Sequence, residues 1–175
     1  MVIFLAGVHG VGKTFLGEPT AKLLGFQYAT ASSLIRRELA GKQNWAENKR
    51  TKNMDDNQEA LISSVSKIVK KSQKSLVLDG HFVLRDEHGS LISLSSDIFK
   101  RLGVSYVILL EAPSATVAER LLVREAPQPL EDIAALAEAE CKNAENICNE
   151  LNIPLIKLLS PSSEQLLSAF KRASL

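Results

Sequence analysis

A glycine-rich segment near the N-terminus constrains the fold of this chain more than any other feature. Residues 7–14 read Gly-Val-His-Gly-Val-Gly-Lys-Thr and satisfy the pattern G-x-x-x-x-G-K-[ST]. The apolar run Val2–Ala6 before this segment is typical of a buried strand, and residues 13–24 after it predict a helix closed by Gly25. A loop of this pattern between a strand and a helix predicts an α/β domain that binds phosphate groups.

Short apolar runs alternate with helical patterns along the rest of the chain, as expected for β-α-β units. Strands are expected at 26–29, 75–79, 104–110 and 153–158. Further helices are expected from a cap at Ser32 or Ser33, over about 55–69, over 114–123, over 129–151, and after Ser160-Pro161. With the first strand, this order predicts one domain over residues 1–175, an α/β/α P-loop NTPase fold with a five-stranded parallel sheet. Pro19 conflicts with the first helix, because proline lacks a backbone N–H and is expected to kink or loosen it.

The residues of the glycine-rich loop predict ATP and Mg²⁺ as ligands. Glycines let successive backbone N–H groups point toward phosphate oxygens, and the following helix adds the positive end of its dipole. Lys13 is expected to reach the β- and γ-phosphates, and the Thr14 hydroxyl is expected to bind Mg²⁺. The expected nucleotide-binding residues are His9, Gly10, Val11, Gly12, Lys13, Thr14 and Phe15 at this loop, and Arg120 further along the chain.

Asp79 is the expected second magnesium ligand, because it ends the strand at 75–79 and P-loop proteins place a carboxylate there. The next residue is Gly80, so the Asp-Glu pair typical of motor-type and remodelling ATPases is missing. This absence favours a small phosphotransferase over a mechanical ATPase.

The charge of the chain is unevenly distributed, although the formal net charge is only +1. Residues 34–52 hold six cations against two anions, which favours an anionic ligand near this segment. The small net charge gives no support for a nucleic-acid or membrane partner. The N-terminal apolar run has no basic residues before it, so a cytoplasmic location is expected.

Two further motifs accompany the glycine-rich loop. Residues 79–81 read Asp-Gly-His, and residues 107–113 read Val-Ile-Leu-Leu-Glu-Ala-Pro and are followed by Glu119-Arg120-Leu121. Together with the loop, these motifs resemble the adenylate-kinase-like P-loop nucleotide kinases, especially the archaeal-type adenylate kinases and the nuclear adenylate-kinase-like ATPases. The resemblance covers most of the chain, and only the loop is specific by itself.

The resemblance implies an acceptor-binding segment at about 30–72 and a short lid at about 120–130. Residues 32–37 stand where such enzymes bind the acceptor, so Arg36, with Arg37 as the weaker candidate, is expected to grip an acceptor phosphate. The lid arginines Arg120 and Arg124 are expected to neutralise charge on the transferred phosphoryl group. His81 is expected to contact the acceptor phosphate or to position a water. The expected catalytic residues are Lys13, Asp79, His81, Arg120 and Arg124; the expected acceptor-binding residues are Ser33, Arg36, Arg37, Gln58, His81 and Phe82.

The sequence departs from this family after Phe82, where nucleotide kinases usually carry an arginine. Residues 86–90 are typical of a turn in an inserted hairpin. Three functions therefore remain open: a nucleoside-monophosphate kinase, a kinase for a non-nucleotide metabolite with Asp79 as the base, and a slow regulatory ATPase that acts through a partner. Each needs ATP and Mg²⁺; the two kinases also need a small phosphate acceptor.

Overall fold

The computed structural model describes residues 1–40, 54–86, 88–122 and 129–174 of the 175-residue chain. Within them, five parallel strands form one sheet in the order β2-β3-β1-β6-β7. These strands are β1 (Val2–Ala6), β2 (Gln27–Thr30), β3 (Leu76–Asp79), β6 (Val104–Glu111) and β7 (Leu155–Leu159). A separate antiparallel hairpin consists of β4 (Val83–Arg85) and β5 (Leu91–Ser93). The expected five-stranded parallel sheet is confirmed.

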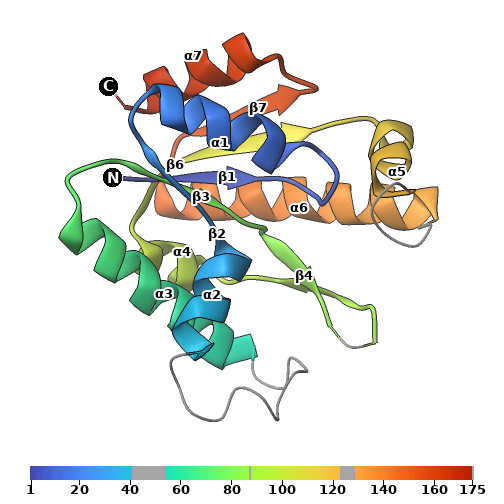
Figure 1. The fold of residues 1–175 in the computed structure, drawn as a ribbon. Helices are drawn as coiled ribbons and strands as arrows, with labels where there is room; N and C mark the ends of the chain where they lie inside the picture. Colours follow the sequence, from blue (N-terminus) through green and yellow to red (C-terminus); the bar gives the residue numbers. More distant parts are fainter. Residues whose placement is uncertain (41–53, 87, 123–128, 175) are drawn as a thin grey trace.

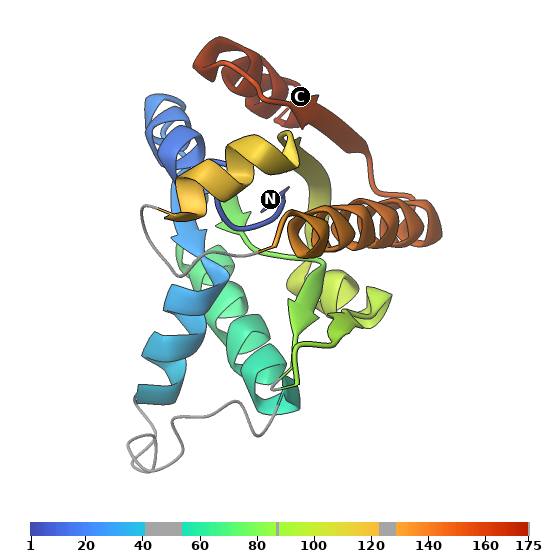
Figure 2. The same ribbon diagram turned by 90° about the vertical axis from the view of Figure 1, so that its right-hand side faces the viewer.

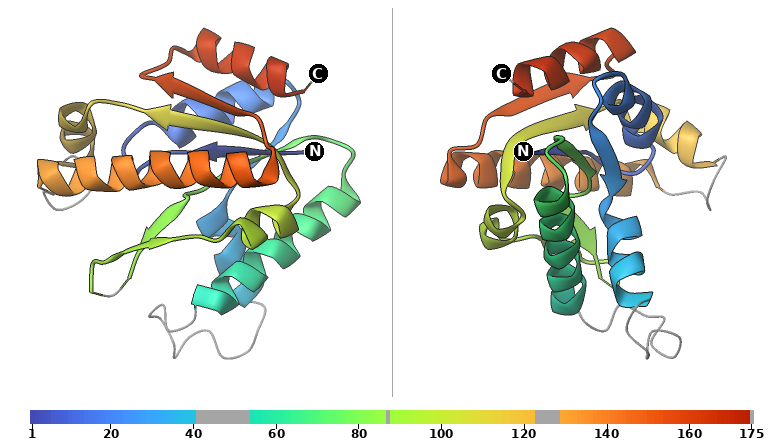
Figure 3. Two further views of the ribbon diagram at one scale, coloured as in Figure 1. Left: turned by 180° about the vertical axis from the view of Figure 1, so that it is seen from behind. Right: turned by 60° about the vertical axis from the view of Figure 1, so that its left-hand side comes forward.

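Helices cover both faces of the sheet (Figures 1 and 2). They are α1 (Lys13–Leu23), α2 (Ala31–Ala40), α3 (Met54–Lys71), α4 (Ser96–Leu102), α5 (Ser114–Leu122), α6 (Leu130–Leu151) and α7 (Ser163–Ala173). Buried residues of α1, α5 and α7 pack on one face, and those of α2, α3, α4 and most of α6 pack on the other. The view from behind in Figure 3 shows α6 lying along this second face. None of the helices in the described parts of the chain combines the length and apolar character needed to cross a bilayer.

Strand β1 is central, and all five of its residues are buried. Its side chains alternate between the two faces: Ile3 and Leu5 join one core, while Phe4 joins the other. Burial on both faces explains why the sequence shows a continuous apolar run rather than an alternating one. In the parallel register Leu5 lies beside Asp79, so the glycine-rich loop after β1 and the motif at the end of β3 meet at one edge of the sheet.

Several element boundaries differ from those expected. Helix α2 begins at Ala31, before the expected caps Ser32 and Ser33. Instead, Thr30 supplies the cap, because its Oγ1 accepts a hydrogen bond from the Ser33 N–H at 3.2 Å. Helix α7 begins at Ser163, with Ser162 as its cap, and helix α4 was not expected at all. The hairpin turn expected at 86–90 is confirmed, since the Asp86 N–H donates to the Ser90 carbonyl.

Pro19 lies inside α1, and the helix continues through it to Leu23. Proline cannot donate the backbone hydrogen bond to the carbonyl of residue 15, so it weakens the exposed side of this helix. We expect Pro19→Ala to raise the free energy of unfolding by about 1–3 kcal/mol, measured by urea denaturation followed by circular dichroism. An unchanged or lower free energy of unfolding would show that α1 tolerates this proline without cost.

Candidate active site

The glycine-rich loop wraps around a space at the carboxyl end of β1. Gly7 and Gly12 have φ angles of 137° and 107°, in the region that L-residues with side chains rarely adopt. A Cβ atom at Gly7 would lie 2.4 Å from the carbonyl oxygen of Leu110 on β6, so no larger residue fits there. The helix α1 starts directly at Lys13, and its N-terminus faces the same space. A curled loop followed by a helix N-terminus has the geometry of a phosphate-binding site.

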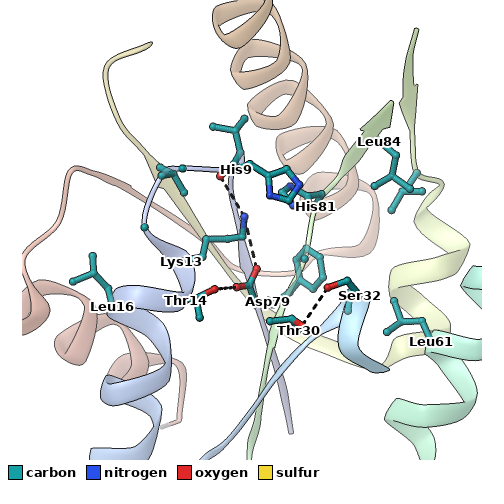
Figure 4. A pocket seen from close by; sticks show the side chains of 18 of the residues that line it. His9, Lys13, Thr14, Leu16, Thr30, Ser32, Leu61, Asp79, His81 and Leu84 are labelled. Atoms are coloured by element: carbon teal, nitrogen blue, oxygen red, sulfur yellow. Dashed lines mark hydrogen bonds and ion pairs between the residues drawn. The ribbon is translucent and has the colours of Figure 1, made fainter. Parts of the chain in front are cut away.

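Lys13 connects the loop to β3. Its side chain is only 6% exposed, and its Nζ donates to the carbonyl oxygens of Gly7 and Val8. The same Nζ lies 3.7 Å from Asp79 Oδ1 (Figure 4). Burial lowers the pKa of Lys13, and the Asp79 carboxylate opposes this shift. The ammonium group thus binds two loop carbonyls and lies beside a carboxylate.

Asp79 ends β3 and is 6% exposed. Its Oδ2 accepts one hydrogen bond from the Thr14 hydroxyl at 3.1 Å and another from the Tyr28 hydroxyl at 2.6 Å. Burial, and next the nearby Asp79 carboxylate, raise the pKa of Tyr28, so this phenol stays protonated and donates. The adjoining hydroxyl and carboxylate oxygens of Thr14 and Asp79 fit Mg²⁺, which prefers oxygen ligands and few protein groups. Tyr28 was not expected from the sequence.

Glu140 on α6 lies beneath the loop and is 1% exposed. Its Oε1 accepts from the Gly7 N–H at 3.3 Å, and its Oε2 accepts from the N–H groups of Phe82 and Val83 at 2.9 and 2.8 Å. One carboxylate therefore ties the start of the glycine-rich loop to the segment that follows Asp79. This residue was not expected from the sequence. Its only signal is that it shares a helical face with the buried residues Ile133 and Ala144.

His9 and His81 lie together at the loop, with ring centroids 4.5 Å apart. Burial, the Lys13 ammonium and His9 lower the pKa of His81 to about 2. The distance from His81 Nδ1 to Glu140 Oε1 is 3.8 Å, too long for a hydrogen bond. His81 is therefore neutral at physiological pH and suited to donate or accept one hydrogen bond toward a ligand.

The lowered pKa of His81 predicts a loss of stability in acid. A histidine whose folded-state pKa lies below its unfolded value near 6.5 binds a proton more readily in the unfolded chain. Its contribution to stability is therefore lost as pH falls below about 6.5, at up to about 1.4 kcal/mol per pH unit. We expect His81→Gln to flatten the fall in free energy of unfolding between about pH 6.5 and 5, measured by urea denaturation. An identical pH slope in both proteins would contradict a neutral, half-buried His81.

Arg120 on α5 reaches the glycine-rich loop. Its Nη1 donates to the carbonyl oxygens of Gly10 and Val11 at 3.2 and 2.9 Å. These contacts place its guanidinium at the rim of the phosphate site. Arg124, the other expected lid arginine, lies outside the described residues, as does the expected lid from 123 to 128.

A cavity of about 880 Å³ joins these groups. Most of the expected site residues line it: His9, Gly10, Val11, Gly12, Lys13, Thr14, Phe15, Gln58, Asp79, His81 and Arg120. Ser160 and Pro161, which were not expected, line it as well. The cavity thus brings the expected nucleotide-binding residues together with Asp79 and His81.

Four expected acceptor-binding residues are not among those that line the cavity: Ser33, Arg36, Arg37 and Phe82. The Ser33 hydroxyl donates to the Thr30 carbonyl, and Arg36 and Arg37 are exposed on α2. Phe82 is fully buried and stacks on Phe99 with ring centroids 4.4 Å apart. Its side chain therefore belongs to the hydrophobic core rather than to the cavity surface, because an apolar ring beside the sheet gains more from burial.

The fold resembles several solved structures over nearly the whole chain. The YorR protein from Bacillus subtilis, in complex with phosphorylated GDP, has a TM-score of 0.62 at 17% identity, with 99% of this chain and 95% of that chain covered. Shikimate kinase from Acinetobacter baumannii, in complex with shikimate, has a TM-score of 0.59 at 17% identity, with 98% and 90% covered. Shikimate kinase from Aquifex aeolicus has a TM-score of 0.58 at 15% identity, with 99% and 96% covered. These matches confirm the P-loop fold shared with kinases and do not distinguish a nucleotide kinase from a kinase of another small acceptor.

The sequence comparisons give a family but no individual relative. No curated protein matches the sequence. Residues 6–136 match the model of a family described as AAA domain, and because this match spans most of the chain, the protein belongs to that family.

Proposed function

We propose that the protein transfers the γ-phosphoryl group of ATP to a small acceptor, with a nucleoside monophosphate as the leading candidate. One observation carries this proposal: a single cavity extends from Lys13, Thr14 and Asp79 to a pocket between α2, α3 and α4. A site for hydrolysis alone needs no such second compartment. The structural likeness to kinases, and the resemblance of the motifs to nucleotide kinases, both support phosphoryl transfer.

The described residues offer a place for each part of the reaction. The loop N–H groups and Lys13 would hold the phosphates, while Thr14 and Asp79 would hold Mg²⁺, which supplies charge neutralisation on phosphate oxygens. Arg120 would leave the loop carbonyls to face charge that develops during transfer. In the transfer, an acceptor oxygen forms a bond to the γ-phosphorus, and the bond to the bridging oxygen breaks, leaving its electron pair on ADP. A phosphate acceptor would need no base, whereas a hydroxyl acceptor would give its proton to Asp79.

A kinase for a non-nucleotide metabolite is the second candidate. Among the described residues that line the cavity, the lysine and arginine side chains are Lys13 and Arg120, both at the loop. The part of the cavity beyond the loop, where the acceptor would bind, therefore offers no cation among those residues to an acceptor phosphate. Arg36 remains the proposed phosphate ligand, since its helix α2 borders the cavity through Ser32 and Ile35.

An assay of ADP formation tests the proposed function. The protein is supplied with ATP·Mg²⁺ and, in separate reactions, nucleoside monophosphates, uncharged nucleosides, hydroxy acids, or no acceptor. Stimulation by a monophosphate supports the leading candidate, and stimulation only by an uncharged or hydroxy-acid compound supports the second. Equal turnover with and without every acceptor would contradict both, and would favour a regulatory ATPase that acts through a partner.

Arg36→Ala separates the two kinase candidates. A guanidinium that binds an acceptor phosphate contributes charge-assisted hydrogen bonds, so its loss is expected to raise KM for the monophosphate by about 10- to 100-fold. KM for ATP is expected to stay unchanged. Arg172→Ala on the exposed side of α7 is the matched control and is expected to behave like wild type. An unchanged KM in Arg36→Ala would exclude this arginine as the phosphate ligand.

A further inference from the structure

The end of the cavity away from the loop is lined mainly by aliphatic side chains. We name it the acceptor chamber and define it by the residues Ile35, Gln58, Leu61, Leu84, Leu94 and Ile98. They come from α2, α3 and α4, from β4 of the hairpin, and from Leu94, which directly follows β5. In Figure 4, Leu61 and Leu84 lie across the cavity from Lys13 and Thr14. The hairpin inserted after β3 thus supplies one wall of this chamber.

The charged groups lie outside the chamber. Among the described residues that line the cavity, Lys13, Asp79 and Arg120 carry full charges, and all three lie at the glycine-rich loop. A charged body placed among aliphatic side chains would lose its hydration without gaining a partner from these residues. The chamber therefore favours an uncharged body that buries apolar surface.

The polar groups near the chamber differ in how well they are satisfied. The hydroxyls of Thr30 and Ser32 lie 3.3 Å apart and pair with each other, and Thr30 also caps α2. Gln58 is 8% exposed and lines the cavity, yet its Oε1 is buried without a hydrogen-bond partner among the described residues. A buried amide oxygen without a donor is unfavourable, so it marks a place where a ligand donor is needed. The terminal torsion of glutamine is soft, which lets the amide turn to meet that donor.

We propose that the acceptor chamber binds a nitrogen heterocycle that carries an amino group, and that Gln58 determines this specificity by accepting its N–H hydrogen bond. A flat heterocycle buries both of its faces against aliphatic side chains and presents polar groups at its edge. The acceptor chamber matches this shape, because it has five apolar residues and the single amide of Gln58. A polyhydroxylated carboxylate does not match, because its hydroxyls and charge would lack partners here. This inference rests on the proposed kinase function, because the chamber then holds the body of the acceptor.

Calorimetric titration of the full chain with two matched pairs of nucleosides tests the inference. Adenosine is compared with purine riboside, and cytidine with 2-pyrimidinone riboside; each second compound lacks only the amino group. Wild type is expected to bind at least one amino compound about tenfold or more tightly than its partner. Gln58→Leu is expected to abolish that difference, while Gln73→Leu, an exposed control between α3 and β3, keeps it. Equal affinities within both pairs, or tighter binding of shikimate than of any nucleoside, would overturn the inference.

Thermal unfolding separates a role in specificity from a role in folding. Leucine has nearly the same volume as glutamine and removes the unsatisfied oxygen, so Gln58→Leu is expected to keep or raise Tm. A Tm lower by several degrees would assign Gln58 a structural role and contradict the inference.

The inference and the kinase function can also fail separately. Amino-dependent binding without any acceptor-stimulated ADP formation contradicts the kinase alone, and acceptor-stimulated ADP formation without that binding preference contradicts the chamber assignment alone.

Discussion

Replacing Lys13 with methionine is expected to lower ATP turnover by about 10²- to 10³-fold. The reason is that Lys13 is the one described lysine that lines the cavity, and it lies where the loop would hold the β- and γ-phosphates. Charge that develops on the transferred group would then have no ammonium beside it. ADP formation under saturating ATP measures the effect, and binding of a fluorescent ATP analogue shows how much of it comes from weaker affinity.

The fold is expected to survive this substitution. Asp79 keeps the hydroxyl donors of Thr14 and Tyr28, so its buried carboxylate is not left without a partner. Methionine also fills the volume of the lysine stem. Lys22→Met, on the exposed last turn of the same helix, is the control and is expected to keep full turnover. Wild-type turnover in Lys13→Met would refute a nucleotide site at the glycine-rich loop.

The half of the candidate site at the glycine-rich loop was predictable because its signals are local in sequence. Eight consecutive residues specify the loop, and the apolar run before Asp79 specifies the strand that carries this carboxylate. Parallel pairing of β1 with β3 then brings Asp79 beside the loop, as any parallel α/β sheet with this strand order requires. The hairpin after Phe82 was predictable for the same reason, since its turn residues are consecutive.

Contacts between distant residues were not predictable. Glu140 binds the N–H of Gly7 across 133 positions, and the Tyr28 hydroxyl binds Asp79 across 51. Neither residue belongs to a motif, and a sequence does not give the distance between a helix and a loop on another element. The boundary of α2 was missed because Thr30 at the end of β2 caps it, while Ser32 and Ser33, two and three residues later, offer the same chemistry.

The acceptor half shows what a charge count leaves open. Cations gather in residues 34–52, but a charge count gives no side-chain direction, and Arg36 and Arg37 are exposed on α2. The side chain of α2 that lines the acceptor chamber is their neighbour Ile35. Consecutive helical residues point in directions about 100° apart, so a charge count does not say which side chain of α2 faces the chamber. The residues that face the acceptor therefore depend on the tertiary placement of the chamber walls.

Replacing Glu140 with leucine is expected to lower the free energy of unfolding by about 3–5 kcal/mol. The carboxylate accepts three backbone N–H groups from Gly7, Phe82 and Val83, and leucine leaves all of them without that acceptor. Each buried donor without a partner costs about 1–3 kcal/mol, so the loss is a large fraction of the 5–15 kcal/mol typical of a domain. Urea denaturation followed by circular dichroism measures it. Glu138→Leu, two residues away and exposed on the same helix, is the control and is expected to change the free energy of unfolding by less than about 0.5 kcal/mol.

Glu140→Gln then tests whether this carboxylate also serves the reaction. Burial raises the pKa of Glu140, and the backbone N–H groups that it accepts oppose the shift. A carboxyl group whose pKa is raised in the folded chain keeps its proton more readily there than in the unfolded chain. Glu140 therefore lowers the free energy of unfolding as pH rises from its unfolded-state pKa, near 4.3, through its folded-state pKa. Glutamine cannot ionise, so it removes this part of the pH dependence. Its amide has only one acceptor oxygen, so its NH2 group faces at least one backbone N–H, and two donors then meet. Because that N–H belongs either to the loop of Lys13 or to the segment after His81, we expect kcat to fall about tenfold even at temperatures where the variant is fully folded. An unchanged kcat together with a lowered free energy of unfolding would show that Glu140 serves folding alone. The relative position of the glycine-rich loop and the segment after His81 would then not depend on this carboxylate.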